Sequence, residues 1–271
     1  MHQKPLYPLL ALLCGGVGLL LRVWQNVVGF EPGTGLVLYG APPLWLLPGA
    51  LALLTAGLLL AVRWLPREAA GAFTAEDSGS TTAGALVTAG ILLSAGSGVM
   101  GLLAGMARQS RLDMVLGAMT VVCMAALLPA AAACKRGGSV PGGVMLVPVA
   151  YCVVRLILTY RESSVDPALA AYYLEILALA ALVMGFYRLS AFGYGCGATR
   201  AFAYWAVLAV TLSITALADF LPFGNRSLDP VSLAFFGGCA LLLLGLLLDR
   251  LRNRGPNAPP PLHQGGRRLM L

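Results

Sequence analysis

The stretch from Val140 to Leu189, VPGGVMLVPVAYCVVRLILTYRESSVDPALAAYYLEILALAALVMGFYRL, decides the fold. It contains two apolar runs joined by an Asp166-Pro167 turn, with Arg155 inside the first run and Glu175 inside the second. A helix needs about 20 apolar residues to cross a hydrocarbon layer about 30 Å thick, and both runs have that length. The stretch therefore predicts a transmembrane helical hairpin with one charge in each arm.

Apolar runs of this length recur along the whole chain. Their approximate bounds are residues 6–28, 43–64, 82–106, 112–134, 140–160, 167–189, 199–221 and 230–250. The runs are continuous and rich in Leu, Ala and Gly, whereas the strands of membrane barrels alternate apolar and polar residues. A composition of 59% hydrophobic and 11% charged residues is also unlike that of soluble domains. The sequence predicts an all-α integral membrane protein of eight transmembrane helices, arranged as four hairpins in a lipid bilayer.

The basic residues predict the orientation of these helices. With the N-terminus in the cytoplasm, twelve lysines and arginines fall on the cytoplasmic side and four on the outer side. The twelve are Lys4, Arg63, Arg67, Lys135, Arg136, Arg188, Arg200, Arg250, Arg252, Arg254, Arg267 and Arg268. The positive-inside rule then places both termini in the cytoplasm and the protein in the cell membrane. Because these residues lie at helix ends and in the tail, the net charge of +7 does not indicate nucleic-acid binding.

An internal repeat is predicted from matches at a constant offset. Leu112-Asp113 corresponds to Leu228-Asp229 and Cys123 to Cys239, all 116 residues apart and without a gap. The first and third hairpins correspond more loosely, with Arg22 opposite Arg155. Two halves of four spans each, residues 1–136 and 137–251, would lie parallel in the membrane. Residues 252–271 are basic and Pro-rich, and they predict a disordered cytoplasmic tail.

An acidic residue precedes each helix that runs inward from an outer turn: Glu31, Asp113, Asp166 and Asp229. An aspartate at such a position accepts hydrogen bonds from first-turn N–H groups, and its charge suits the positive end of the helix. We therefore interpret the three aspartates as helix caps. Glu31 stands farther from its helix and suits a local turn.

Charges inside the spans are the candidates for function, because each costs roughly 3 kcal/mol at the centre of a membrane helix. Counting from the Asp166-Pro167 turn places Arg155 and Glu175 at the same depth, with Tyr151 and Tyr172 near that level. Arg22 has a similar depth in the first half, where the facing helix carries no acid. Two arginines and one carboxylate would give a net positive ligand-binding pocket. The alternative is an Arg155–Glu175 ion pair that locks the helices, with Arg22 reaching toward the outer interface.

The third span carries a stripe of small residues, Gly90, Ser94, Gly98, Gly101 and Gly105. Small residues on one face let two helix backbones approach closely, and such a stripe can also line a narrow path through a bundle. Both interpretations stay open on the sequence, and packing is the simpler one. The seventh span carries a weaker polar stripe, Thr211, Thr215 and Asp219.

Catalytic, metal and cofactor sites are not predicted. Both histidines, His2 and His263, lie in the terminal segments, which leaves the spans without a histidine for a zinc site or a catalytic triad. The six cysteines are dispersed and form no C-x-x-C pair. We therefore predict a non-enzymatic protein without a metal or other cofactor.

Two functions remain compatible with these features. The first is a transporter or permease for a small anionic or zwitterionic solute, bound between the two halves in the outer part of the bundle. Parallel repeats with a site at their interface are typical of solute carriers. The second is an accessory, assembly or sensory membrane protein that acts through its cytoplasmic loops and tail. The sequence does not indicate an oligomeric state.

Overall fold

The computed structural model describes residues 6–31, 36–38, 40–63, 81–136, 140–164, 172–223 and 227–252, without the side chains of residues 136, 163 and 252. The described residues form helices and short turns, and their only β-type pairing is an isolated antiparallel bridge between Phe30 and Val37. Within these described ranges, eight helical segments are long and apolar enough to cross a membrane, which confirms the predicted number of spans. The chain is an all-helical, multi-pass membrane protein.

Six spans are formed by single helices or by a helix with a short extension. These are α1 (Leu6–Val28), α2 (Pro43–Val62), α3 (Thr81–Arg108), α8 (Tyr173–Gly193), α9 (Thr199–Ala216) with its 3₁₀ extension η2 (Leu217–Phe220), and α10 (Pro230–Arg252). The bounds of α1 are those expected from the sequence. By contrast, α8 begins six residues after the expected start of its span, and the Asp166-Pro167 turn lies outside the described residues.

Two spans are each divided into two helices by a proline. The fourth consists of α4 (Arg111–Ala126) and α5 (Leu128–Arg136), and the fifth of α6 (Gly142–Met145) and α7 (Val147–Ser163). Pro129 and Pro148 are the second residues of α5 and α7. Proline lacks an N–H group and is tolerated in the first turn of a helix, so each division falls just before a proline.

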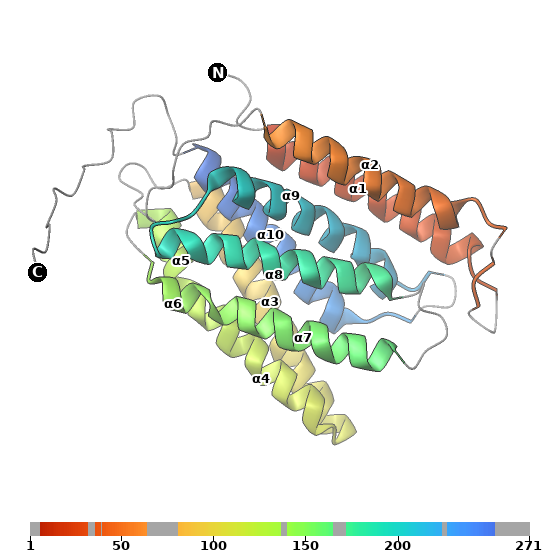
Figure 1. Ribbon diagram of the computed structural model, residues 1–271. Helices are drawn as coiled ribbons and strands as arrows, with labels where there is room; N and C mark the ends of the chain where they lie inside the picture. Colours follow the sequence, from red (N-terminus) through yellow and green to blue (C-terminus); the bar gives the residue numbers. More distant parts are fainter. Residues whose placement is uncertain are drawn as a thin grey trace, which may run out of the picture.

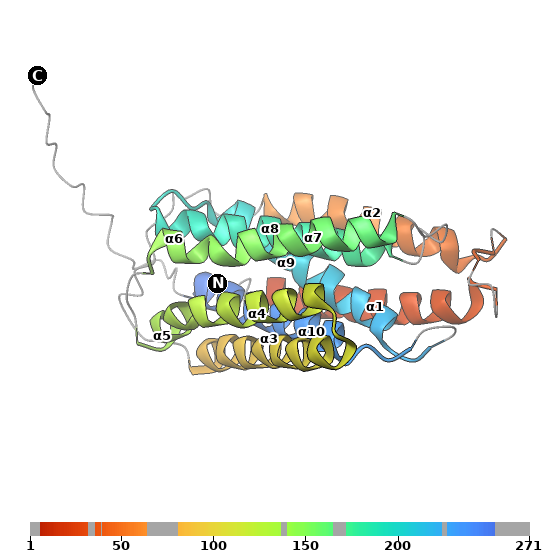
Figure 2. The ribbon, with the colours of Figure 1, turned by 90° about the horizontal axis from the view of Figure 1, so that it is seen from below.

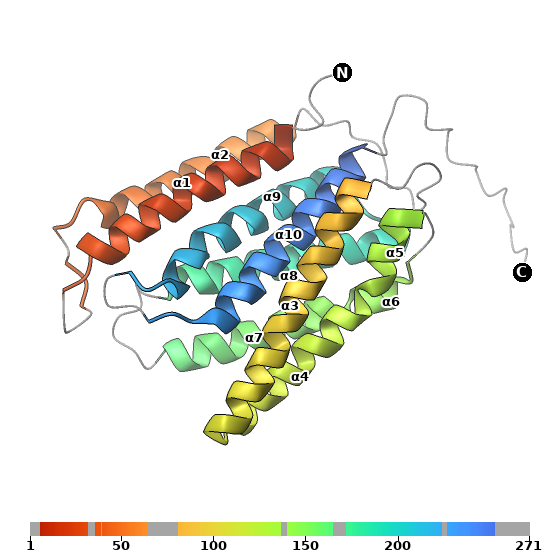
Figure 3. The same cartoon turned by 180° about the vertical axis from the view of Figure 1, so that it is seen from behind.

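The helices pack around α9 and α10: 72% of the residues are buried in an 18-residue stretch of each of these two spans, against 22% in such a stretch of α2. The hairpin α1–α2 contacts α9, and the hairpin α3–α4 lies on the other side, with α3 packed extensively against α10 (Figures 1 and 3). The helix α8 joins α9 to α7. The two hairpins of the predicted first half are thus separated by helices of the second half, and the division into halves stays a prediction.

The surface around the sides of the helix bundle is apolar, as contact with lipid requires. Leu20, Trp45, Leu53, Leu92 and Val122 are all more than 60% exposed. Soluble proteins rarely expose so many large apolar side chains, because the transfer of apolar surface from water into the protein interior is favourable. Figure 2 shows the helices lying roughly alongside one another, as expected of membrane spans.

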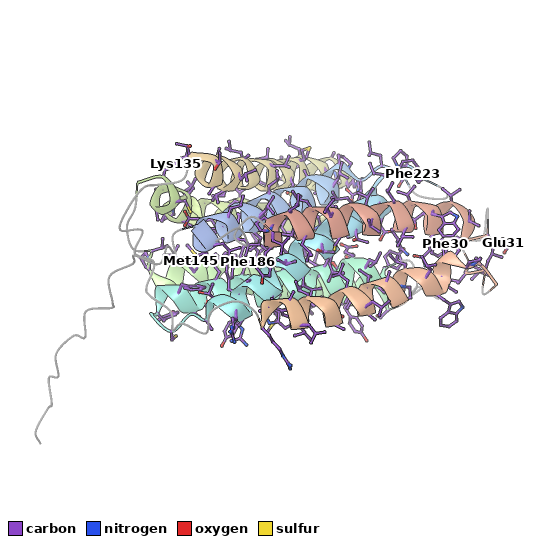
Figure 4. All side chains as sticks on the ribbon, turned by 90° about the horizontal axis from the view of Figure 1, so that it is seen from above. Phe30, Glu31, Lys135, Met145, Phe186 and Phe223 are labelled. Carbon is purple, nitrogen blue, oxygen red and sulfur yellow. The ribbon has the colours of Figure 1, made fainter. Side chains whose placement is uncertain are left out.

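The two ends of the bundle are easily distinguished. The start of α1 and the end of α10 lie at the same end of the bundle, together with Lys135 (Figures 1 and 4). Phe30, Glu31 and Phe223 lie at the opposite end (Figure 4). We call this opposite end the distal end. It corresponds to the outer side in the predicted orientation.

Candidate functional site

A cavity of about 760 Å³ lies at the distal end of the bundle, between α3, α4, α7, α8, η2 and α10. Four of the residues expected at a ligand site line it: Tyr151, Arg155, Tyr172 and Glu175. Arg22, the fifth, is not among its lining residues. The volume of the cavity is within the range of pockets that bind small ligands, about 300–1,000 Å³.

Arg155 is held on the cavity wall by three side chains, one from its own helix and two from α10. Its guanidinium lies 4.0 Å from the ring centroid of Phe235 on α10, which covers one face of the group. One terminal nitrogen donates a hydrogen bond to Tyr151 Oη at 3.3 Å, and the other donates to Ser232 Oγ at 3.1 Å. Guanidinium has five N–H donors in a planar fork. Arg155 is therefore oriented in advance and still has donors to offer an anionic group in the cavity.

Tyr151 connects Arg155 to α4. Its oxygen lies 2.6 Å from Thr120 Oγ1, which lies 2.8 Å from the carbonyl oxygen of Leu116. The threonine has one hydroxyl proton and the carbonyl can only accept. The consistent arrangement is that Thr120 donates to Leu116, Tyr151 donates to Thr120, and Tyr151 accepts from Arg155. This series of hydrogen bonds fixes the side of the Arg155 guanidinium that faces α4. The Tyr151 side chain at its centre is buried.

Glu175 lies nearer the distal end than its sequence position suggested. Because α8 begins at Tyr173, Glu175 belongs to the first turn of the helix, where a negative charge is favoured by the helix dipole. Arg155 is eight residues before the end of α7, so the expected equal depth of the two charges is wrong. Glu175 nevertheless attracts Arg155 electrostatically across the cavity wall. Tyr172, just before α8, lines the same cavity.

Arg22 is paired inside the protein and does not reach the outer interface. Its side chain is fully buried, and its Nε donates to Asp219 Oδ1 at 2.7 Å, while Nη1 donates to Gln25 Oε1 at 2.7 Å. Asn26 donates to the same Asp219 oxygen at 3.1 Å and to the carbonyl of Ala218. The expectation that Arg22 and Arg155 share one carboxylate is therefore wrong. The missed partner is Asp219, on η2.

The charge of the cavity differs from the expected positive sign. Its lining includes two arginines, Arg108 and Arg155, and five carboxylates, Asp113, Glu162, Glu175, Asp219 and Asp229. Since Arg22 neutralises Asp219, four carboxylates remain against two arginines. Counted over the described residues of its lining, the site is therefore net negative. It has one well-fixed arginine, and it offers groups for both a negative and a positive part of a ligand.

Two aspartates of the lining also have structural positions. Asp229 Oδ1 accepts from the backbone N–H groups of Val231 and Ser232 at 3.1 and 3.3 Å, so it caps α10 as expected. Asp113 does not cap α4, because Ser110 does so by accepting from the N–H group of Asp113 at 3.3 Å. The Asp113 carboxylate is thereby left available to the cavity.

The small residues of α3 have two different surroundings. A side chain on Gly90 would lie 2.6 Å from backbone atoms of Gly238 and Leu242, and Ser94 lies against α10 as well. A side chain on Gly98 or on Gly105 would lie 2.9 or 2.7 Å, respectively, from a backbone atom of α4. Gly101, by contrast, lines the cavity. The stripe thus brings α3 close to two helices and has one member at the candidate site.

No group of three histidine, cysteine or carboxylate side chains within the described ranges is placed to hold a metal ion. No family model matches the chain, and no curated protein and no solved structure has significant similarity to it. The geometry of the distal cavity therefore carries the functional argument.

Proposed function

We propose that the chain is a transporter-type membrane protein that binds a small zwitterionic solute in its distal cavity. The observation that carries the proposal is Arg155, fixed by Tyr151, Ser232 and Phe235 on the wall of a cavity otherwise rich in carboxylates. The anionic group of the solute binds the free donors of Arg155. Its cationic group binds near Glu175 and the other carboxylates of the lining.

The charge balance favours a zwitterion over a simple anion. An anion entering the cavity gains from Arg155 but is repelled by several carboxylates. Repulsion between like charges at short range costs several kcal/mol at a desolvated site. A positive group on the same solute converts this repulsion into attraction. Under the predicted orientation, such a solute enters from outside the cell.

Binding can be tested by thermal stabilisation of the purified protein. The probes are glycine, taurine and glycerophosphoethanolamine as zwitterions, acetate and inorganic phosphate as anions, and ethanolamine as a cation. We expect a zwitterion to raise the melting temperature more than the matching anion or cation. Equal stabilisation by the anions would contradict the zwitterion, and no stabilisation by any probe would contradict the site.

The role of Arg155 can be tested with Arg155→Lys, which keeps the charge and removes the planar fork. Loss of hydrogen bonds to a charged group costs about 1.5–3 kcal/mol, so we expect binding of the best zwitterion to weaken about tenfold or more. The matched control is Arg161→Lys, on the exposed part of the same helix and outside the lining. Unchanged affinity in Arg155→Lys would contradict the assignment.

Transport itself is tested by uptake of the best radiolabelled probe into proteoliposomes. Uptake that is lost in Arg155→Lys and kept in Arg161→Lys would support a transporter. Binding without uptake would favour the accessory or sensory function over transport.

A further inference from the structure

Asp219 belongs both to the distal cavity and to a buried ion pair outside it. It is one of the residues that line the cavity, and only 8% of its surface is exposed. Its Oδ1 accepts hydrogen bonds from Arg22 Nε at 2.7 Å and from Asn26 Nδ2 at 3.1 Å. Neither Arg22 nor Asn26 is among the lining residues. Asp219 therefore connects the cavity to a positive charge that a bound solute does not contact.

The guanidinium of Arg22 is held in a fixed position next to the cavity. Its side chain is fully buried, and Nη1 donates a hydrogen bond to Gln25 Oε1 at 2.7 Å. Its Cζ lies 5.3 Å from the ring centroid of Tyr173 and 5.9 Å from that of Phe30. Tyr173 begins α8, two residues before Glu175. The charge of Arg22 is thus fixed close to the part of the cavity where the cationic group of the proposed solute binds.

Arg22 changes the charge balance of the cavity without lining it. The described lining has two arginines and five carboxylates, and Arg22 offsets the charge of one carboxylate, Asp219. Without Arg22, the cavity would have one more uncompensated negative charge. A unit charge that acts over about 12 Å at the boundary of a protein changes a binding constant about tenfold. The cavity would then bind a cation more tightly and an anionic group less tightly.

Resting on the proposed function, we infer that Arg22 is a specificity-determining residue of the cavity, which disfavours simple cations without touching the solute. It acts through Asp219, whose charge it neutralises. The negative charge of the lining is thereby kept low enough for the anionic group of a zwitterion to reach Arg155. Because this effect is electrostatic, it changes the preference between cation and anion, whereas a purely structural ion pair would change stability alone.

The first test removes the positive charge with Arg22→Met. Binding to the purified full-length protein is measured by titration calorimetry at pH 8, where carboxylates are ionised. The probes are ethanolamine as the cation, acetate as the anion, and glycine, taurine and glycerophosphoethanolamine as the zwitterions. We expect the affinity for ethanolamine, relative to that for the best-bound zwitterion, to rise about tenfold. The matched control is Arg161→Met, which removes an exposed arginine outside the lining in the last turn of α7 and should leave this ratio unchanged.

The second test removes the negative charge with Asp219→Asn. The asparagine keeps an oxygen that can accept from Arg22, but the charge of Arg22 is no longer neutralised. We expect the affinity for acetate, relative to that for the best-bound zwitterion, to rise about tenfold. The double variant Arg22→Met with Asp219→Leu has neither charge and should show both ratios of the wild type. Thermal unfolding identifies the folded variants, and Asp219→Asn decides the question where Arg22→Met does not fold.

The outcomes distinguish this inference from the function on which it rests. If a zwitterion binds the wild type but both ratios are unchanged in the folded single variants, the zwitterion site stands and the role of Arg22 is overturned. If the affinities for all probes fall by the same factor, the pair is purely structural, and the inference is also overturned. If no probe binds any of the folded proteins, both proposals fall.

Discussion

The pair of Arg22 and Asp219 shows what sequence reasoning can achieve for a single residue. The position of Arg22 within a span indicated that it needs a partner, and it has one at 2.7 Å. The identity of that partner could not be predicted, because it lies 197 residues away and apolar helices carry little information about which neighbour they face. The only sequence signal for Asp219 as the partner was its place in the polar stripe of Thr211, Thr215 and Asp219. This stripe points to Arg22 only once α1 is known to contact α9.

This pair leads to a prediction about stability. Asp219→Ala leaves the Arg22 guanidinium buried without its carboxylate, and breaking a buried ion pair costs about 3–5 kcal/mol. We expect a clear fall in the midpoint of unfolding, measured by thermal denaturation in detergent. The double variant Arg22→Met with Asp219→Leu should recover much of the loss, since no charge stays buried. A single variant as stable as the wild type would contradict the pairing.

At the scale of the helix, the spans were predictable because hydropathy over about 20 residues is a strong signal. The predicted bounds of α1 were confirmed, whereas the start of α8 was misplaced, and with it the depth of Glu175. The error arose because a proline after a turn was taken as the first residue of the helix. The divisions before Pro129 and Pro148 were also missed, although both prolines are visible in the sequence.

The close contact of α3 with α10 can be tested with a matched pair of glycines. In Gly90→Ala the new methyl group would lie 2.6 Å from backbone atoms of α10, so the helices must separate, and overpacking typically costs about 1–3 kcal/mol. Gly96 is on the same helix with no atom within 4 Å of an added methyl group, and Gly96→Ala should be neutral or slightly stabilising. Thermal denaturation of both variants measures the difference. Equal stability of the two would contradict the packing of α3 on α10.

At the scale of the whole molecule, the sequence predicted eight spans but not their neighbours. The matches at an offset of 116 suggested two four-helix halves, yet α1 packs on α9 and α3 on α10. Which helices contact one another depends on side-chain shape over many residues. A low-complexity apolar sequence contains little information about these contacts. The cavity follows from these contacts, since its lining comes from residues 97 to 120 and from residues 151 to 232.

The orientation of the molecule decides whether the cavity faces the outside of the cell. Cys196 is exposed in the turn between α8 and α9, while four of the other five cysteines are buried. That turn lies at the end opposite the cavity, near Lys135 (Figures 1 and 4).

If the basic end is cytoplasmic, a membrane-impermeant maleimide should label Cys196 only after the cells are permeabilised. With Cys196→Ser as background, Gln109→Cys in the distal turn between α3 and α4 should be labelled in intact cells. The reverse pattern would place the cavity on the cytoplasmic side, and the solute would then be taken from the cytoplasm.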